Sequence, residues 1–92
     1  MENKIIPGRL VSSTAGRDSG RYYLILDLAD NGMIRVVNGS ERKLASPKKK
    51  NVRHLKFHPQ VAEEIKAKII SGERLTDQDI RKALAFLLNG SE

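Results

Sequence analysis

The alternation of apolar and polar residues changes its period once along the chain. Between residues 9 and 57, short apolar runs are separated by Gly, Pro, Asn and Ser, a pattern typical of short strands and turns. From residue 59 onward, apolar residues recur at helical spacing instead. We therefore expect a β-rich part followed by a helical part.

The β-rich part begins with three strands. A Pro-Gly turn precedes the first, RLVS at residues 9–12. The second, residues 21–29, carries apolar side chains on both faces, so we expect both faces to be covered. An Asp-Asn-Gly turn at residues 30–32 predicts a hairpin into the third strand, residues 33–37.

Two shorter strands are expected to complete the sheet. We place them at residues 41–45 and 52–57, with the Lys-rich residues 48–50 in a loop between them. Short strands with tight turns and no crossover helix predict a mainly β fold, a small antiparallel barrel of the SH3-like type.

The helical part predicts two amphipathic helices joined as a C-terminal two-helix hairpin. The first has Pro59 in its first turn and ends at Ser71-Gly72. The second begins at Thr76, which with Asp79 has the spacing of a capping box, and ends at Asn89-Gly90. The apolar stripes are Val61, Ala62, Ile65, Ile69 and Ile70 in the first helix and Ile80, Ala83, Leu84, Leu87 and Leu88 in the second.

Neither apolar stripe can remain in water. We expect the hairpin to pack on the outer face of the barrel, over Tyr23, Ile25 and Val37, because satellite helices usually complete a small core. The alternative is that one stripe docks on a partner protein.

The net charge of +6 is concentrated in the first part of the chain. Residues 1–58 hold 12 Lys/Arg and 5 Asp/Glu, a charge of +7, whereas residues 59–92 hold 5 and 6, a charge of −1. This break predicts two units, a basic barrel over residues 1–58 and a helical hairpin over residues 59–92. The basic unit is suited to phosphates.

The composition argues against several classes of protein. There is no Cys, so disulfides and thiolate metal sites are excluded. The apolar runs are too short to span a bilayer and the N-terminus lacks a signal segment, so we expect a cytoplasmic protein with no membrane partner. No Ser with a local base, isolated carboxylate pair or Gly-rich nucleotide loop is evident, which predicts a non-enzyme with no cofactor and no small-molecule substrate.

Cationic residues indicate where a polyanion would bind. Seven Lys and Arg lie from residue 42 to residue 56 with no acid among them. Arg17 lies at a loop tip, where its guanidinium could hold a phosphate through two hydrogen bonds. The candidate RNA-binding residues are Arg17, Arg21, Arg42, Lys43, Lys48, Lys49, Lys50, Arg53, His54 and Lys56. The alternatives are a solvated basic face and, for Arg17, an ion pair with Asp18.

Three residues are expected to shape the loop after the first strand. Gly16 and Gly20 allow positive φ, and Asp18 can accept hydrogen bonds that fix the turn. His54 and His58 would suit zinc on a helix, but they lie in a strand and before a Pro with no third ligand nearby, so we expect no metal site.

The loop SSTAGRDSG, the apolar strand after it and the sequence NVRHLK resemble the KOW-motif ribosomal proteins. The most similar group is the archaeal and eukaryotic large-subunit proteins numbered fourteen-e, six-e and twenty-seven-e, with their stand-alone bacterial relatives. The likeness covers about residues 6–57. It implies an SH3-like barrel, a KOW domain, that binds ribosomal RNA through loop and basic residues.

We therefore expect an RNA-binding protein of the translation machinery, associated with the large-subunit RNA in a ribonucleoprotein. A ribosomal protein or translation factor would be a further partner. With only four aromatic residues, binding should depend on phosphates and folded RNA shape rather than on stacked bases. The alternative is a protein–protein interaction module, in which the barrel or the helical hairpin grips another protein of the translation or transcription machinery.

Overall fold

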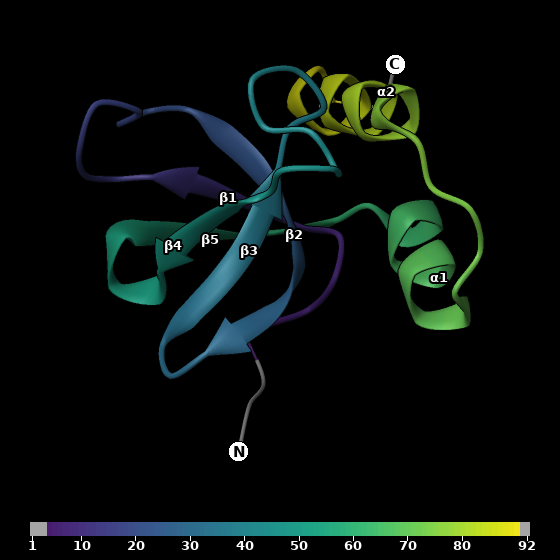
Figure 1. The fold of residues 1–92 in the computed structure, drawn as a ribbon. Coiled ribbons are helices and arrows are strands. Elements are labelled where there is room, and N and C mark those ends of the chain that lie inside the picture. Colours follow the sequence, from purple (N-terminus) through teal and green to yellow (C-terminus); the bar gives the residue numbers. More distant parts are fainter. Residues whose placement is uncertain (1–3, 91–92) are drawn as a thin grey trace.

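The computed structural model describes residues 4–90, which form one antiparallel sheet and two helices (Figure 1). The strands are β1 (Arg9–Ser13), β2 (Tyr22–Asp30), β3 (Met33–Val37), β4 (Lys48–Asn51) and β5 (Leu55–Val61), in the order β4-β3-β2-β1-β5. The helices are α1 (Glu63–Ser71) and α2 (Asp77–Leu88). Neither helix is long and apolar enough to cross a membrane.

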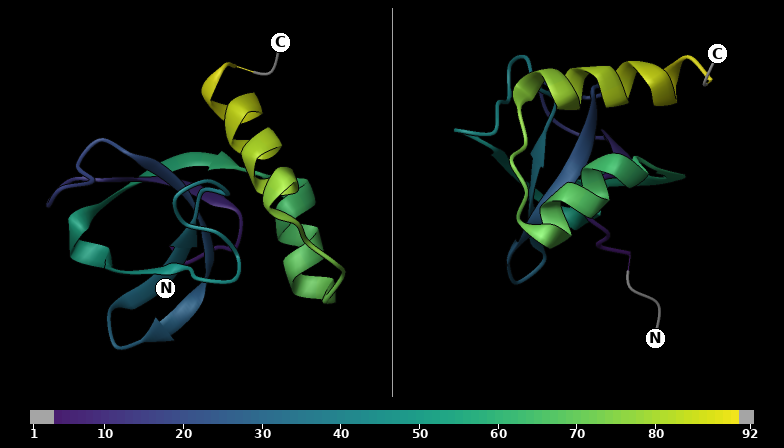
Figure 2. Two further views of the ribbon diagram at one scale, coloured as in Figure 1. Left: turned by 45° about the horizontal axis from the view of Figure 1, so that its top comes forward. Right: turned by 90° about the vertical axis from the view of Figure 1, so that its right-hand side faces the viewer.

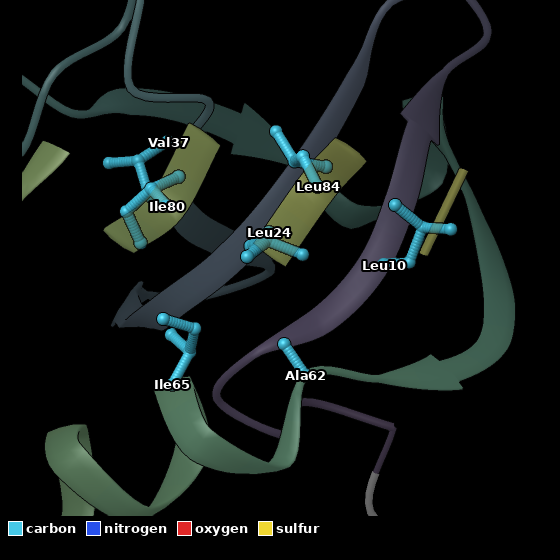
Figure 3. Close-up of a cluster of buried hydrophobic side chains, with 7 residues drawn as sticks. All are labelled: Leu10, Leu24, Val37, Ala62, Ile65, Ile80 and Leu84. Carbon is cyan, nitrogen blue, oxygen red and sulfur yellow. The ribbon is translucent and has the colours of Figure 1, made fainter. Parts of the chain in front are cut away.

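The sheet is curled, and the two helices lie on one side of it (Figure 2). It has a hydrophobic core on each of its faces. The inner core holds Val11, Tyr23, Ile25, Ile34, Val36 and Leu55. The outer core, between the sheet and the helices, holds Leu10, Leu24, Val37, Ala62, Ile65, Ile80 and Leu84 (Figure 3). Because adjacent residues of β2 serve opposite cores, the prediction that both faces of this strand are covered is confirmed.

The prediction that the helices pack on the sheet is also confirmed, but two of the expected contacts are wrong. Tyr23 and Ile25 point into the curl of the sheet, away from the helices. Leu10 and Leu24 lie under the helices instead, beside the correctly predicted Val37. The period of two in β2 was evident from the sequence, but the face that would lie inside the curl was not.

The helix ends follow local sequence signals, with one exception. Gly72 ends α1 in the left-handed region, and Thr76 and Asp79 form the predicted capping box of α2. Pro59 is the exception, because β5 continues through it and α1 begins only at Glu63. Pro59 lies where the register between β1 and β5 shifts, at the edge of the sheet, so no ladder hydrogen bond needs its missing N–H.

The strand assignments between residues 41 and 57 need correction. Residues 41–45 form no strand, because Asn38 accepts hydrogen bonds from the backbone of Ser40 and Arg42 and folds the chain into a compact turn. The Lys-rich segment expected to be a loop is β4, paired with β3. Residues 52–54 form a 3-10 turn, and the final strand runs from Leu55 to Val61.

The loop between β3 and β4 rests on the N-terminal turns of α2. Asp77 Oδ1 accepts a hydrogen bond from the Leu44 backbone at 2.8 Å, and Arg81 donates to the Gly39 carbonyl at 2.6 Å. Gly39 has φ +79°, and a Cβ there would lie 2.6 Å from the Asp77 carbonyl oxygen. Only glycine satisfies both constraints, so this contact holds the loop on the helix.

Candidate nucleic-acid interface

A buried ion pair fixes the loop between β1 and β2. The Asp18 carboxylate accepts hydrogen bonds from Lys50 at 3.2 Å, from Ser13 at 2.9 Å and from Tyr23 at 2.7 Å. Lys50 also donates to Ser13 Oγ at 3.0 Å. The side chains of Asp18 and Lys50 are 14% and 9% exposed, so each charge depends on the other and on these hydrogen bonds. Asp18 thus has the loop-shaping role predicted for it, through side chains rather than backbone amides.

This network shifts two pKa values in opposite directions. Burial raises the pKa of Asp18, but hydrogen bonds from Tyr23, Ser13 and Lys50, with the charge of Lys50, outweigh it and lower the pKa to about 2. Burial and the hydrogen bond to Asp18 raise the pKa of Tyr23 to about 12. At neutral pH the carboxylate is charged and the phenol is protonated, as the geometry requires.

A cleft of about 590 Å³ opens above this network. Its walls come from the loop between β1 and β2, the loop between β3 and β4, β4 and the 3-10 turn. Six of the predicted RNA-binding residues line it: Arg17, Arg21, Arg42, Lys48, Lys50 and His54. Two stretches distant in sequence, residues 15–23 and 41–54, therefore meet around one cationic depression that also contains Asp18 and Glu41.

The cations of the cleft differ in their availability. The side chains of Arg17, Arg42 and Lys48 make no hydrogen bond or ion pair with any residue from 4 to 90, so the ion pair considered between Arg17 and Asp18 is not formed. Arg21 is paired with Glu41 at 3.0 Å, and Asn38 donates to the same carboxylate at 2.9 Å. Three cations can thus take a new anion directly, while Arg21 must first leave Glu41.

The remaining predicted residues lie outside the cleft. Lys43, Lys49, Arg53 and Lys56 are exposed but do not line it. Lys49 projects to the opposite side of β4 from its neighbours, because side chains alternate along a strand, and pairs with Asp30 at 3.6 Å. Of the three consecutive lysines, Lys48 lines the cleft unpaired and Lys49 lies on the opposite face, whereas Lys50 lines the cleft as the buried partner of Asp18.

The loop glycines adopt the predicted backbone conformation. Gly16 and Gly20 have φ values of +85° and +91°. Gly16 lines the cleft, and Gly20 has open space where a Cβ would lie. Their role is to allow this loop path rather than close packing against the rest of the chain.

Sequence reasoning missed a pairing between Ser12 and His58. Ser12 Oγ and His58 Nε2 share a hydrogen bond of 2.9 Å between β1 and β5. Burial, followed by the charges of Lys56 and Arg9, lowers the pKa of His58. The two residues are 46 positions apart, so no local pattern could reveal the contact.

No model of a known protein family matches the chain.

Proposed function

We propose that this protein binds RNA and associates with the ribosome, gripping phosphates of the large-subunit RNA in the cleft. One observation carries the proposal: Arg17 and, from a distant stretch of the chain, Arg42 and Lys48 face one cleft without a partner among the described residues. Unpaired cations that converge in this way are suited to neighbouring phosphates of one polyanion. The curled five-stranded sheet also supports an SH3-like barrel of the KOW type, the fold implied by the loop sequence.

The proposal is for binding rather than catalysis. The Ser12–His58 pair is the nearest approach to a nucleophile and base among residues 4–90. No carboxylate hydrogen-bonds to His58 in this part of the chain, and the charges that act on it, those of Lys56 and Arg9, are cationic. A neighbouring cation disfavours the imidazolium that a general base must form, so the pair is suited to holding β1 against β5.

The test uses two lysines that are neighbours in sequence but lie on opposite faces of β4. Lys48→Glu should weaken binding to a large-subunit RNA transcript by tenfold or more, since it reverses a charge in the cleft. Lys49→Glu makes the same change of net charge outside the cleft and should have a much smaller effect. Fluorescence anisotropy gives both values, and equal weakening would contradict the proposed site. Lys50 is unsuitable, because replacing it leaves Asp18 buried without its cation.

The salt dependence tests how many phosphates are held. With three free cations and Arg21, the slope of log affinity on log salt should be about −3 to −4, shallower than ten scattered contacts would give.

Ribosome association itself is tested on sucrose gradients of lysate at low salt. Migration of the protein with the large subunit, lost for Lys48→Glu but kept for Lys49→Glu, is the expected result; a protein that stays at the top of the gradient would contradict the ribosomal assignment.

A further inference from the structure

A second surface hollow lies between the two helices, separate from the cleft. It is a groove of about 450 Å³ whose apolar lining includes Ile65, Ala83, Phe86 and Leu87. Phe86 is 57% exposed, although it borders this apolar surface. The groove and the cleft share no residue, so a molecule bound in one need not occupy the other.

Both helices contribute charges of both signs to the rim of the groove. Lys68 of α1 and Asp79 of α2 pair with each other at 3.4 Å. The unpaired charges are Glu63 and Glu64 on the α1 side and Lys82 on the α2 side. Within residues 4–90, Glu63 and Glu64 are the carboxylates that make no ion pair or hydrogen bond, and Lys82 makes none either. An occupant with the opposite arrangement of charges would pair with all three.

We propose that the occupant is a second copy of this chain, related by a twofold axis and contributing its own α2. In a twofold interface every contact occurs twice, with the roles of the two copies exchanged. Lys82 of each copy can therefore face Glu63 and Glu64 of the other. Phe86 of each copy then enters the apolar groove of the other as the anchor. The helices alone thus supply an apolar anchor, its receiving surface and both signs of charge.

The charge distribution of the whole chain favours contact on this side. The molecule carries +6, so two copies repel each other, but residues 59–92 account for −1 and residues 1–58 for +7. The loop between β1 and β2 and the 3-10 turn, which form walls of the cleft, lie on the side of the barrel away from α1 (Figure 1). A dimer through the groove therefore brings together the least repulsive surfaces and keeps these two cleft walls away from the contact.

Sedimentation equilibrium of the full chain, from low micromolar to near-millimolar concentration, tests the proposal. We expect a monomer–dimer equilibrium that Phe86→Ala weakens by about tenfold or more, because a central aromatic anchor is removed. Ile70→Ala is the matched control, since Ile70 is 67% exposed on α1 but does not line the groove. The proposal is overturned by a protein that stays monomeric throughout, or by a dimer that Phe86→Ala leaves intact.

Charge exchange tests the arrangement independently of Phe86. Lys82→Glu should weaken the dimer, and adding Glu63→Lys and Glu64→Lys in the same chain should restore it. Arg74→Glu, in the loop between the helices and outside the groove, should leave it unchanged. Failure of the exchange to restore association, with helical circular dichroism unchanged, would overturn the twofold arrangement. Lys48→Glu should reduce RNA binding without dissociating the dimer, so failure of one proposal can be told from failure of the other.

Discussion

The pairing of Asp18 with Lys50 shows how one residue holds the binding loop in place. Asp18→Asn leaves the Lys50 ammonium buried without a counter-charge, and we expect the free energy of unfolding to fall by about 3 kcal/mol. Asp27→Asn is the matched control, because Asp27 pairs with Arg35 in an exposed position and should cost about 1 kcal/mol or less. Urea denaturation measures both; equal losses would show that burial adds nothing to the Asp18 pair.

The same network predicts how stability depends on pH. The pKa of Asp18 is lowered to about 2 in the folded protein, so its contribution is complete above its ordinary pKa of 3.8 and is lost as the pH falls toward 2. The pKa of Tyr23 is raised to about 12, so its contribution is complete below pH 10 and is lost as the pH rises through 12. Urea unfolding across the acid range should show a decline between about pH 4 and about pH 2 that is smaller in Asp18→Asn. An equal decline in both proteins would contradict the assignment.

Glu41 limits the affinity of the cleft for anions. It occupies Arg21 at 3.0 Å, so a phosphate that uses Arg21 must displace this carboxylate. Glu41→Gln should therefore tighten RNA binding by about threefold, by removing a negative charge and freeing a cation. Glu73→Gln makes the same change of net charge outside the cleft and should have a smaller effect in the same anisotropy assay. Equal tightening in both variants would point to net charge alone.

At the scale of single residues, the sequence predicts the local role of a residue better than it predicts which distant residue it contacts. The loop-shaping role of Asp18 and the position of Arg17 in the same loop could be inferred from local sequence. The burial of Lys50 could not, because its partner lies 32 positions away and nothing in a run of lysines marks one of them as buried. The Ser12–His58 contact was missed for the same reason.

At the scale of elements, one glycine controls how the loop between β3 and β4 meets α2. Gly39→Ala must accept both a positive φ and a Cβ 2.6 Å from the Asp77 carbonyl oxygen, and we expect a loss of about 3 kcal/mol in unfolding free energy. Gly32→Ala measures the cost of the positive φ alone, since Gly32 has φ +67° and nothing within 4 Å of an added Cβ. It should cost about 1–2 kcal/mol. Similar losses of unfolding free energy for the two variants in urea denaturation would show that the loop can shift away from α2 at Gly39 without further cost.

Elements with a clear hydrophobic period were predictable, and elements without one were not. The first three strands and α2 follow from alternation, turn residues and the Thr76–Asp79 capping box. The strand β4 has no apolar alternation, so its sequence did not predict a strand. Its lysines form a strand because they pair with Ile34, Arg35 and Val36 of β3. Residues 41–45 contain no β-branched or aromatic residue, and Asn38 and Asp77 accept hydrogen bonds from their backbone in place of a neighbouring strand.

At the scale of the whole molecule, the break in charge beside Pro59 is not a break in packing. The strand β5 passes through Pro59 and ends at Val61. Leu10, Leu24 and Val37 of the sheet are 0–2% exposed because α1 and α2 cover them. The hydrophobic surface of the sheet is thus divided between two cores that share β1 and β2, so losing one core should also weaken the other.

This shared packing predicts that the sheet and helices unfold together. A chain ending at Val61 keeps all five strands but exposes Leu10, Leu24 and Val37 to water, so we expect it to lose cooperative unfolding. In the full chain, Ile80→Ala removes a fully buried side chain of α2 and should lower the free energy of unfolding by about 2–4 kcal/mol. Helical circular dichroism and tyrosine fluorescence, to which Tyr23 of the other core contributes, should report the same transition midpoint in this variant. Two separated transitions, or a 1–61 fragment that unfolds as cooperatively as the full chain, would establish the five-stranded sheet as an independent domain.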